Sequence, residues 1–285
     1  MSKDRLFAII ILNYMSFEDT INELECLKKL TGIEMCKVFV IDNASENDSV
    51  TQLSMYFERE HTFEHELISN TFNAGYAIGN NIGLRKALSD GFKYALILNN
   101  DILFPDDNLL KVLKKVADSD KNIGCCSPRI YSLNGKEMHQ HLLRPSFLDL
   151  SFGRISYRLR ENNLESRNAS RRGIVENYRS QGCCMVVDLV KIEKVGFLDE
   201  STFLYYEEAI LAEKLIEKGW KAVLALDTCV IHNHSNTVKS VAVKKQIVKW
   251  VCDSARIYYR KFRRFNNFQV QLCLLFDLIR EYLFV

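Results

Sequence analysis

The stretch "YALILNNDILFP", residues 94–105, joins an apolar run to a polar end. The apolar residues 94–98 are followed at once by Asn99, Asn100 and Asp101. A short apolar run bounded by polar residues is typical of a strand that crosses a protein core. Three hydrogen-bonding side chains at its end either form a turn, where such residues are favoured, or serve a ligand. The neighbouring segments bear on this choice.

Apolar runs alternate with helical patterns through the first third of the chain. The expected strands cover residues 7–12, 37–42, 65–70 and 94–99, and the expected helices cover residues 17–31 and 77–90. Strands that alternate with helices over short connections predict βαβ units and a parallel sheet. Right-handed crossovers then place the strand C-termini at one edge, where open α/β sheets bind ligands.

All four expected strands end in polar residues. The ends are Leu12-Asn13-Tyr14, Asp42-Asn43-Ala44-Ser45, residues 70–75 and Asn99-Asn100-Asp101. An ordinary turn explains one such end. A series of four at the same edge favours a ligand site there.

The second half of the chain continues the pattern less regularly. Helices are expected at 106–123 and 205–219, and strands at 124–131, 181–190, 221–227 and 229–234. Between them, residues 144–178 are polar and rich in arginine. Such a segment predicts either a mobile loop or lid, or a solvated linker.

The composition fits a folded α/β protein. Of the 285 residues, 47% are hydrophobic, and the net charge of +2 gives no argument for a nucleic-acid partner. Nine cysteines without a CxxC pair predict reduced thiols of a cytoplasmic protein. The apolar run after "MSKDR" is too short to span a membrane and predicts the first strand.

The C-terminal segment, residues 238–285, has a helical pattern. Its middle part, "RIYYRKFRRF" at 256–265, mixes five basic residues with aromatic ones. This composition fits attachment to an anionic membrane surface. It fits equally a helix that packs on the domain and exposes a solvated basic face.

Asp101 and two histidines are the candidate metal ligands. A carboxylate at the ligand-binding edge of a sheet can bind a hard divalent cation, which in turn binds phosphates. The run "VIHNH" carries His232 and His234, which alternation along a strand directs to the same face. A lone histidine is more often structural, but this spacing raises the case for a metal ligand.

Glu207 and Glu208 are the candidate catalytic acids. They stand near the start of the helical pattern at 205–219. Acids in the first turn of a helix often only complement the helix dipole. Alternatively, one of them is a general base that removes a proton from a sugar hydroxyl.

An ordered set of motifs carries a family resemblance. The motifs are "IIILNY", "VIDNAS", "NAGYAIGNNIGL", "LILNND", "QGCCMVV", "GFLDESTFLYYEEAILAEKL", "GW" and "VIHNHS". Over about residues 5–237 the chain resembles the inverting, metal-dependent GT-A glycosyltransferases of family 2, especially bacterial rhamnosyltransferase-like enzymes. The resemblance implies a Rossmann-like, mostly parallel α/β sheet flanked by helices, with a C-terminal helical extension. It divides residues 1–237 into a nucleotide-binding half, about 1–105, and an acceptor-side half, about 106–237.

The same resemblance implies roles for individual residues. Nucleotide contacts fall on Leu12 (through its backbone), Tyr14, Asp42, Asn43, Asn73, Ala74, Gly75, Asn81, Asn99, Asn100 and Asp101. Asp101 and His232 are expected to hold Mg²⁺ or Mn²⁺, with His234 as the competing ligand. Glu208 is the expected base, with Glu207 as the second candidate.

The implied reaction moves a sugar, with inversion, from a UDP or dTDP donor to a glycan or lipid-linked oligosaccharide of bacterial surface polysaccharide synthesis. A pyrimidine is expected because the small pocket implied by Tyr14 and Asp42 suits it. The implied place is the cytoplasm, with peripheral contact to the inner membrane face.

Two departures from the family pattern leave an alternative open. Asn99 stands where an Asp is usual, and Ile210 stands where another Asp is common. The alternative is an inactive sugar-nucleotide-binding or scaffold subunit. A dehydrogenase is excluded, because "LNYMSFEDT" after the first strand lacks the glycines of G-x-G-x-x-G.

Overall fold

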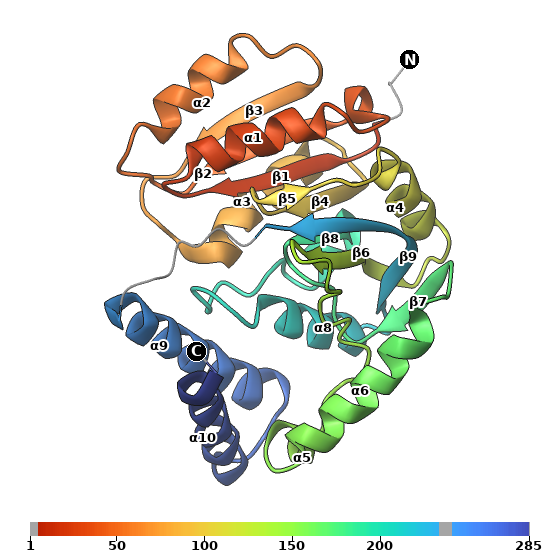
Figure 1. The fold of residues 1–285 in the computed structure, drawn as a ribbon. Coiled ribbons are helices and arrows are strands. Elements are labelled where there is room, and N and C mark those ends of the chain that lie inside the picture. Colours follow the sequence, from red (N-terminus) through yellow and green to blue (C-terminus); the bar gives the residue numbers. More distant parts are fainter. Residues whose placement is uncertain (1–4, 234–240, 285) are drawn as a thin grey trace.

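The first half of the chain forms a parallel sheet. The computed structural model describes residues 5–233 and 241–284, with side chains over 5–233 and 245–280 (Figure 1). The first four strands are β1 (Ala8–Asn13), β2 (Lys37–Asp42), β3 (Glu64–Ser69) and β4 (Tyr94–Leu98), in the order β3-β2-β1-β4. Asn13 pairs with Asp42, and Asp42 with Ser69, so the polar ends lie level at one edge.

Helices cover both faces of this sheet. They are α1 (Phe17–Leu27), η1 (Ile33–Met35), α2 (Ser49–Phe57) and α3 (Gly75–Ser89). Alternate residues of β1 face opposite sides: Ile9 and Ile11 join one buried cluster, and Ile10 joins the other. Each fully buried isoleucine contributes roughly 2 kcal/mol. Helix α2 was not expected, because its nine residues bury only Ser49, Leu53 and Phe57.

The second half extends the sheet with mixed directions. Its elements are β5 (Ile102–Leu103), α4 (Leu109–Asp118), β6 (Ile123–Ser132), β8 (Cys184–Asp188), α7 (Leu189–Lys194), α8 (Glu207–Glu217) and β9 (Lys221–His232). Strand β8 runs antiparallel between β4 and β6, and β9 runs parallel to β6. The two runs expected at 221–227 and 229–234 are one strand, whose pairing with β6 shifts register between Pro128 and Arg129.

The prediction of a loop or linker at 144–178 was wrong. This segment forms α5 (Phe147–Leu150), α6 (Arg154–Asn168) and β7 (Ile174–Asn177). Helix α6 buries Glu161 and Asn168 rather than an apolar stripe, so its sequence lacks the usual helical period. Arg129 donates to both carboxylate oxygens of Glu137 and to the Asn168 carbonyl, which ties α6 to β6.

The C-terminal helices pack on the rest of the chain. They are α9 (Val241–Ile257), the π-helical turn η2 (Tyr258–Phe262) and α10 (Asn267–Phe284). Tyr258 and Tyr259 are fully buried in a cluster that includes Ala209 and Ile210 of α8. The aromatic residues expected to meet a membrane therefore serve packing. Among the described helices, none has the length and apolarity to cross a bilayer.

Candidate functional site

Asn13 and Asp42 form a buried network at the ends of β1 and β2. Asn13 Nδ2 donates to Asp42 Oδ2 at 2.7 Å, and Thr20 Oγ1 donates to Asn13 Oδ1 at 2.8 Å. The Ser45 amide donates to Asp42 Oδ1 at 2.9 Å, and the Ser45 hydroxyl donates to Oδ2 at 2.7 Å. Both carboxylate oxygens of Asp42 thus accept bonds within the chain. Beside this network Tyr14 is 46% exposed.

Asn43 organises the loop between β3 and α3. Its Nδ2 donates to Asn73 Oδ1 at 2.9 Å, and its Oδ1 accepts from the Ala74 amide at 3.2 Å. The Gly75 amide donates to Asn73 Oδ1 at 3.1 Å. Leu12 packs its side chain against Gly79 of α3. Asn43 and Asn73 therefore shape this loop through their side chains.

Gly75 and Asn81 bind α3 to the segment before α8. Asn81 Nδ2 donates to the Leu198 carbonyl at 3.0 Å and to Glu200 Oε1 at 2.9 Å. Gly75 has φ +80°, and a Cβ there would lie 2.3 Å from the Phe203 carbonyl oxygen. Only glycine tolerates both conditions. Asn81 is fully buried, so its contact with this segment is structural.

The three residues after β4 point in different directions. The Asn99 amide donates to the Cys183 carbonyl at 2.9 Å. Asn100 Nδ2 turns back to α1 and donates to Ser16 Oγ at 2.8 Å and to Thr20 Oγ1 at 2.9 Å. Asp101 faces β9 instead. The triplet thus divides into two anchoring residues and one carboxylate at the edge.

Asp101 and His232 lie together, as expected of a metal site. The pairing of Ile102 with His232 between β5 and β9 brings Asp101 Oδ1 to 3.0 Å from His232 Nε2. The Asn233 amide donates to the Asp101 carbonyl at 2.8 Å, which fixes the end of β9. His234 lies outside the described residues.

Acidic side chains of α1 surround Asp101. Burial raises the pKa of Glu23 well above its usual value, and the charge of Asp101 raises it further. Burial and then Asp101 likewise raise the pKa of Asp19. The donor set of one carboxylate and one imidazole fits Mg²⁺ or Mn²⁺, and a cation would relieve the repulsion among these acids.

Glu208 is held by the segment that enters β8. The Gly182 amide donates to Glu208 Oε1 at 3.0 Å, and Arg179 lies 3.4 Å from Oε2. Tyr76 Oη donates to the Gly182 carbonyl at 2.9 Å. A Cβ at Gly182 would lie 2.7 Å from Glu208 Oε1, so the close approach requires glycine.

Glu207 differs from Glu208 in its surroundings. Glu207 is 3% exposed, whereas Glu208 is only partly buried. Burial, followed by the charge of Glu208, raises the pKa of Glu207 to about 8. Near neutral pH, Glu207 therefore favours the protonated form, in which it adds no second negative charge beside Glu208.

Cys183 connects the two carboxylate sites. Its carbonyl accepts a hydrogen bond from the backbone amide of Asn99. The backbone amide of the preceding residue, Gly182, donates to Glu208 Oε1. Burial raises the pKa of the Cys183 thiol, and the charges of Glu208 and Asp101 raise it further. Asp101 and Glu208 therefore both lie near one short stretch of backbone.

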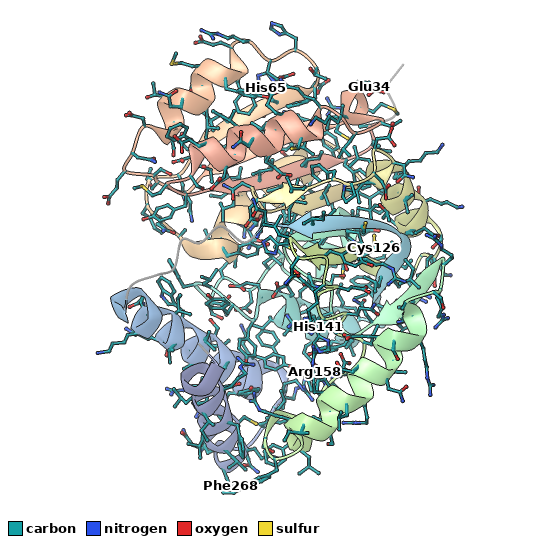
Figure 2. The ribbon with its side chains drawn as sticks, viewed as in Figure 1. Glu34, His65, Cys126, His141, Arg158 and Phe268 are labelled. Atoms are coloured by element: carbon teal, nitrogen blue, oxygen red, sulfur yellow. The ribbon has the colours of Figure 1, made fainter. Side chains whose placement is uncertain are left out.

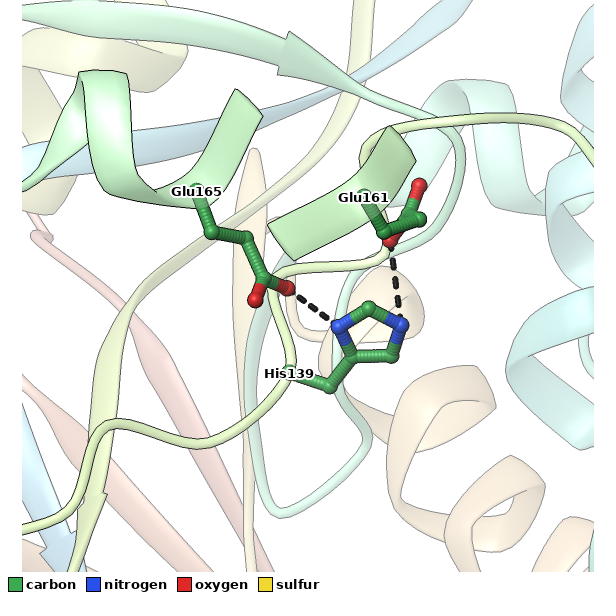
Figure 3. Close-up of side chains that lie close together, drawn as sticks. All are labelled: His139, Glu161 and Glu165. Carbon is green, nitrogen blue, oxygen red and sulfur yellow. Dashed lines mark hydrogen bonds and ion pairs between the residues drawn. The ribbon is translucent and has the colours of Figure 1, made fainter. Parts of the chain in front are cut away.

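A second group of titratable residues lies beside this site. His139 contacts Glu165 through Nδ1, and its Nε2 lies 3.0 Å from Glu161 Oε2 (Figure 3). The His139 and His141 rings are 4.6 Å apart, and His141 Nε2 lies 3.2 Å from Arg179 (Figure 2 labels His141). One nitrogen and two oxygens of His139, Glu161 and Glu165 lie within 4.8 Å, a spacing that a metal could use. With a carboxylate at each ring nitrogen, His139 fastens α6 to the adjoining segment.

Comparison with known proteins decides the family. The model of glycosyl transferase family 2 matches residues 8–186, more than half of the chain, a range that includes Asp101 and Gly182 but not Glu208 or His232. The chain belongs to glycosyl transferase family 2. The resemblance to family 2 seen in the sequence is thereby confirmed.

Relatives agree with this family membership. The low-salt glycan biosynthesis hexosyltransferase Agl10 of Haloferax volcanii is 28% identical over 203 residues. That match covers 70% of this chain, and the chain spans only 58% of the relative's length.

Solved structures agree with the GT-A fold. The mannosyltransferase PcManGT from Pyrobaculum calidifontis, in complex with GDP-Man and Mn²⁺, has a TM-score of 0.64 at 14% identity, covering 98% of this chain and 70% of that one. TarS 1-349 of S. aureus, in complex with UDP-GlcNAc, has a TM-score of 0.59 at 13% identity, covering 98% and 73%. The expected GT-A fold is confirmed.

Several residues of this family 2 site escaped the sequence analysis. Asn13 and Gly182 stood inside the quoted motifs "IIILNY" and "QGCCMVV" and were given no role. Arg179 and Glu23 had no sequence signal, since each is a single charge in a polar or amphipathic stretch. Their contacts with the site form only when the fold brings these segments to the edge of the sheet.

Proposed function

We propose that the chain is an inverting, metal-dependent hexosyltransferase that uses a nucleoside-diphosphate sugar. The observation that carries this proposal is that Glu208 binds the Gly182 amide while the end of β4, next to Asp101, binds the Cys183 carbonyl, so both carboxylates lie near one stretch of backbone. A glycosyl transfer needs charge stabilisation at the leaving diphosphate and a base at the attacking hydroxyl. We assign charge stabilisation to the Asp101 side and the base to Glu208.

Asp101 and His232 are the proposed metal ligands. The 3.0 Å separation of Asp101 Oδ1 and His232 Nε2, together with the nearby acids Asp19 and Glu23, supports this assignment. Bound Mg²⁺ or Mn²⁺ would offset the negative charge of the departing diphosphate. The Mn²⁺ in the PcManGT complex supports the same choice.

Glu208 is the proposed base. Its Oε1 is fixed by the Gly182 amide, and Arg179 lies beside Oε2. In the reaction, Glu208 takes the proton of the acceptor hydroxyl as that oxygen bonds to the anomeric carbon. The bond from that carbon to the diphosphate breaks on the opposite face, which inverts its configuration. Glu207, with its raised pKa, remains protonated and keeps the negative charge on Glu208.

The proposed donor is a UDP- or dTDP-sugar bound along the edge from Tyr14 to Asn99. The exposed ring of Tyr14 beside the Asn13–Asp42 network supports a base contact there. The known complexes contain GDP-Man in PcManGT and UDP-GlcNAc in TarS, so both nucleotide classes belong in the test.

The proposed acceptor is a hydroxyl of a glycan or lipid-linked oligosaccharide in the assembly of a surface polysaccharide. The name of the Agl10 relative, which refers to glycan biosynthesis, supports this class. The proposed location is the cytoplasm, at the inner face of the membrane.

The inactive-scaffold alternative rests on Asn99 and Ile210. Ile210 is fully buried in the cluster with Tyr258 and Tyr259, so this position anchors the C-terminal helices. Loss of an acid at this position is therefore explained by packing and gives no independent sign of inactivity.

A panel of nucleotide sugars tests the proposal. UDP-, dTDP- and GDP-sugars are each added with Mn²⁺, and the melting temperature is measured before and after chelation. We expect one UDP- or dTDP-sugar to raise the melting temperature, and chelation to abolish the effect. The same donor should then lose its sugar, by transfer or slow hydrolysis, with wild type and not with Glu208→Gln. Stabilisation without any turnover would instead support the scaffold function.

A further inference from the structure

Exposed apolar side chains gather at one end of the molecule. Among the described residues, seven large apolar side chains of α5, α6, α10 and their junctions are more than two fifths exposed. They are Leu148, Phe152, Ile155, Leu159, Phe268, Leu275 and Ile279. We refer to these seven residues as the apolar ridge. Ile155 is 79% exposed and Phe268 is 72% exposed.

The apolar ridge comprises two helical stripes, one on α6 and one on α10. Ile155 and Leu159 are four residues apart and share a face of α6, while Phe268, Leu275 and Ile279 share a face of α10. The rings of Phe152 and Phe276 meet edge to face at 5.2 Å. Arg154 also forms an ion pair of 2.8 Å with Asp277. These contacts fasten the start of α6 to α10, and buried Asp277 lies on the side of α10 away from the exposed stripe.

The ridge lies far from the nucleotide-binding half. Figure 2 shows Phe268 at the opposite end of the molecule from His65 of β3. Large exposed apolar patches on soluble proteins are costly to keep in water and mark interaction sites. The ridge therefore calls for a partner that buries apolar side chains.

The charge around the ridge identifies that partner. Residues 144–172 contain seven basic and three acidic residues, and residues 256–280 contain six basic and one acidic residue. The net charge of the whole chain is only +2, so the remaining residues together carry a net negative charge. Among the described side chains, Arg167, Arg172 and Arg260 are exposed and form no ion pair. Arg260 also donates to Asn267, the neighbour of Phe268.

We propose that the apolar ridge docks on a bilayer that contains anionic lipids. Apolar side chains would enter the interfacial layer, while the surrounding arginines contact lipid phosphates. A second copy of the chain is a poorer partner, because two basic ends would face each other. This proposal concerns the ridge alone and does not depend on the transfer reaction.

The position of the ridge links it to the cleft. Helix α10 and η2 pack on Ala209 and Ile210, the two residues after Glu208. Docking through α10 would therefore hold the cleft near the bilayer surface, where a lipid-linked hydroxyl is available.

Vesicle binding tests this inference. Wild-type protein is sedimented with vesicles of phosphatidylcholine alone or with one quarter phosphatidylglycerol, at low and high salt. We expect binding to the mixed vesicles that weakens with salt. The Ile155→Glu/Leu159→Glu variant should bind about tenfold less, or weaker still. The same loss is expected for Phe268→Glu, since these exposed positions leave the core intact.

Met55→Glu is the matched control. Met55 is 46% exposed on α2, in the nucleotide-binding half, and this variant should bind vesicles like wild type. Circular dichroism and melting curves check that all variants fold. Equal binding by the ridge variants and wild type, or no binding by wild type, would overturn the proposal. Wild-type dimers that the ridge variants lose, seen by sedimentation velocity, would instead assign the ridge to a contact between copies.

A soluble acceptor separates this inference from the proposed function. Ridge variants should keep wild-type transfer to a water-soluble sugar acceptor, because no ridge residue lies among the proposed ligands or the base. A loss of vesicle binding with unchanged transfer supports docking. Equal loss of transfer to the soluble acceptor would show that the substitutions disturb the cleft and would overturn the separate role.

Discussion

The two parts of the candidate site are built on different physical principles. At the nucleotide edge, Asn13 donates to Asp42, both of whose carboxylate oxygens are hydrogen-bonded, and the neutral side-chain amide of Asn43 donates to Asn73. At the β8 side, Glu207 and Glu208 lie next to each other, and burial raises the pKa of Glu207. The first arrangement gives a rigid surface for recognition. In the second, Glu207 favours the protonated form near neutral pH and adds no second negative charge beside Glu208.

Removal of the proposed base, Glu208, should have the largest effect on turnover and should leave the nucleotide edge unchanged. We expect Glu208→Gln to lower kcat by about 10³-fold, because a positioned base contributes roughly that much. Donor binding, measured by calorimetry, should stay near the wild-type value, since the nucleotide edge is intact. Glu217→Gln, an exposed acid at the end of the same helix, is the matched control. Near-normal turnover in Glu208→Gln would remove Glu208 from the mechanism.

Substitution of the proposed metal ligand, Asp101, should affect donor binding. We expect Asp101→Asn to weaken Mn²⁺-dependent donor binding by about 10–100-fold, a usual loss when a metal site is impaired. Asp106→Asn, five residues further on, should bind Mn²⁺ and donor like wild type. The measurement is a Mn²⁺ titration at fixed donor concentration. Unchanged Mn²⁺ dependence in Asp101→Asn would show that the cation is held elsewhere.

Gly182 tests how sharply Glu208 is placed. In Gly182→Ala, the new Cβ would meet Glu208 Oε1 and Tyr76 Oη, so Glu208 must move. We expect kcat to fall about tenfold or more, since small displacements of a catalytic group are costly. The melting temperature should show whether the fold is kept. Wild-type kcat in a stably folded Gly182→Ala protein would argue that the contact with Gly182 is not needed for catalysis.

The smallest expected effect concerns stability and pH. Between about pH 4.5 and pH 8 the unfolded chain loses the Glu207 proton that the folded chain keeps, so the free energy of unfolding falls as the pH rises. Glu207→Gln cannot titrate at this position, so its free energy of unfolding should not show this fall with rising pH. Its melting temperature should exceed that of wild type by roughly 5 °C at pH 9 and differ little at pH 5. The same difference at both pH values would contradict the raised pKa.

The sequence was most informative where residues close in the chain act together. The buried strands β1, β2 and β4 are continuous apolar runs, and polar residues follow each run directly. The apolar runs therefore predicted the strands, and the polar residues predicted where the strands end. Helix α6 was missed because its buried face holds Glu161 and Asn168, whose partners come from distant segments. The sequence also left open whether the aromatic residues of η2 face a membrane or pack on the domain, and Tyr258 is buried against Tyr178 at a hydroxyl distance of 2.7 Å.

By itself, the sequence determined the α/β class and the polar ends of the first strands, and its ordered motifs gave the likeness to family 2. It also nominated Asp101, His232 and Glu208 as site residues. The strand ends follow from local patterns, since each carries its own polar residues. Only the tertiary structure decided that Asn100 turns away to α1, that Gly182 holds Glu208, and that the exposed apolar surface lies on α6 and α10. These facts depend on contacts between segments far apart in the chain, and no local period encodes such contacts.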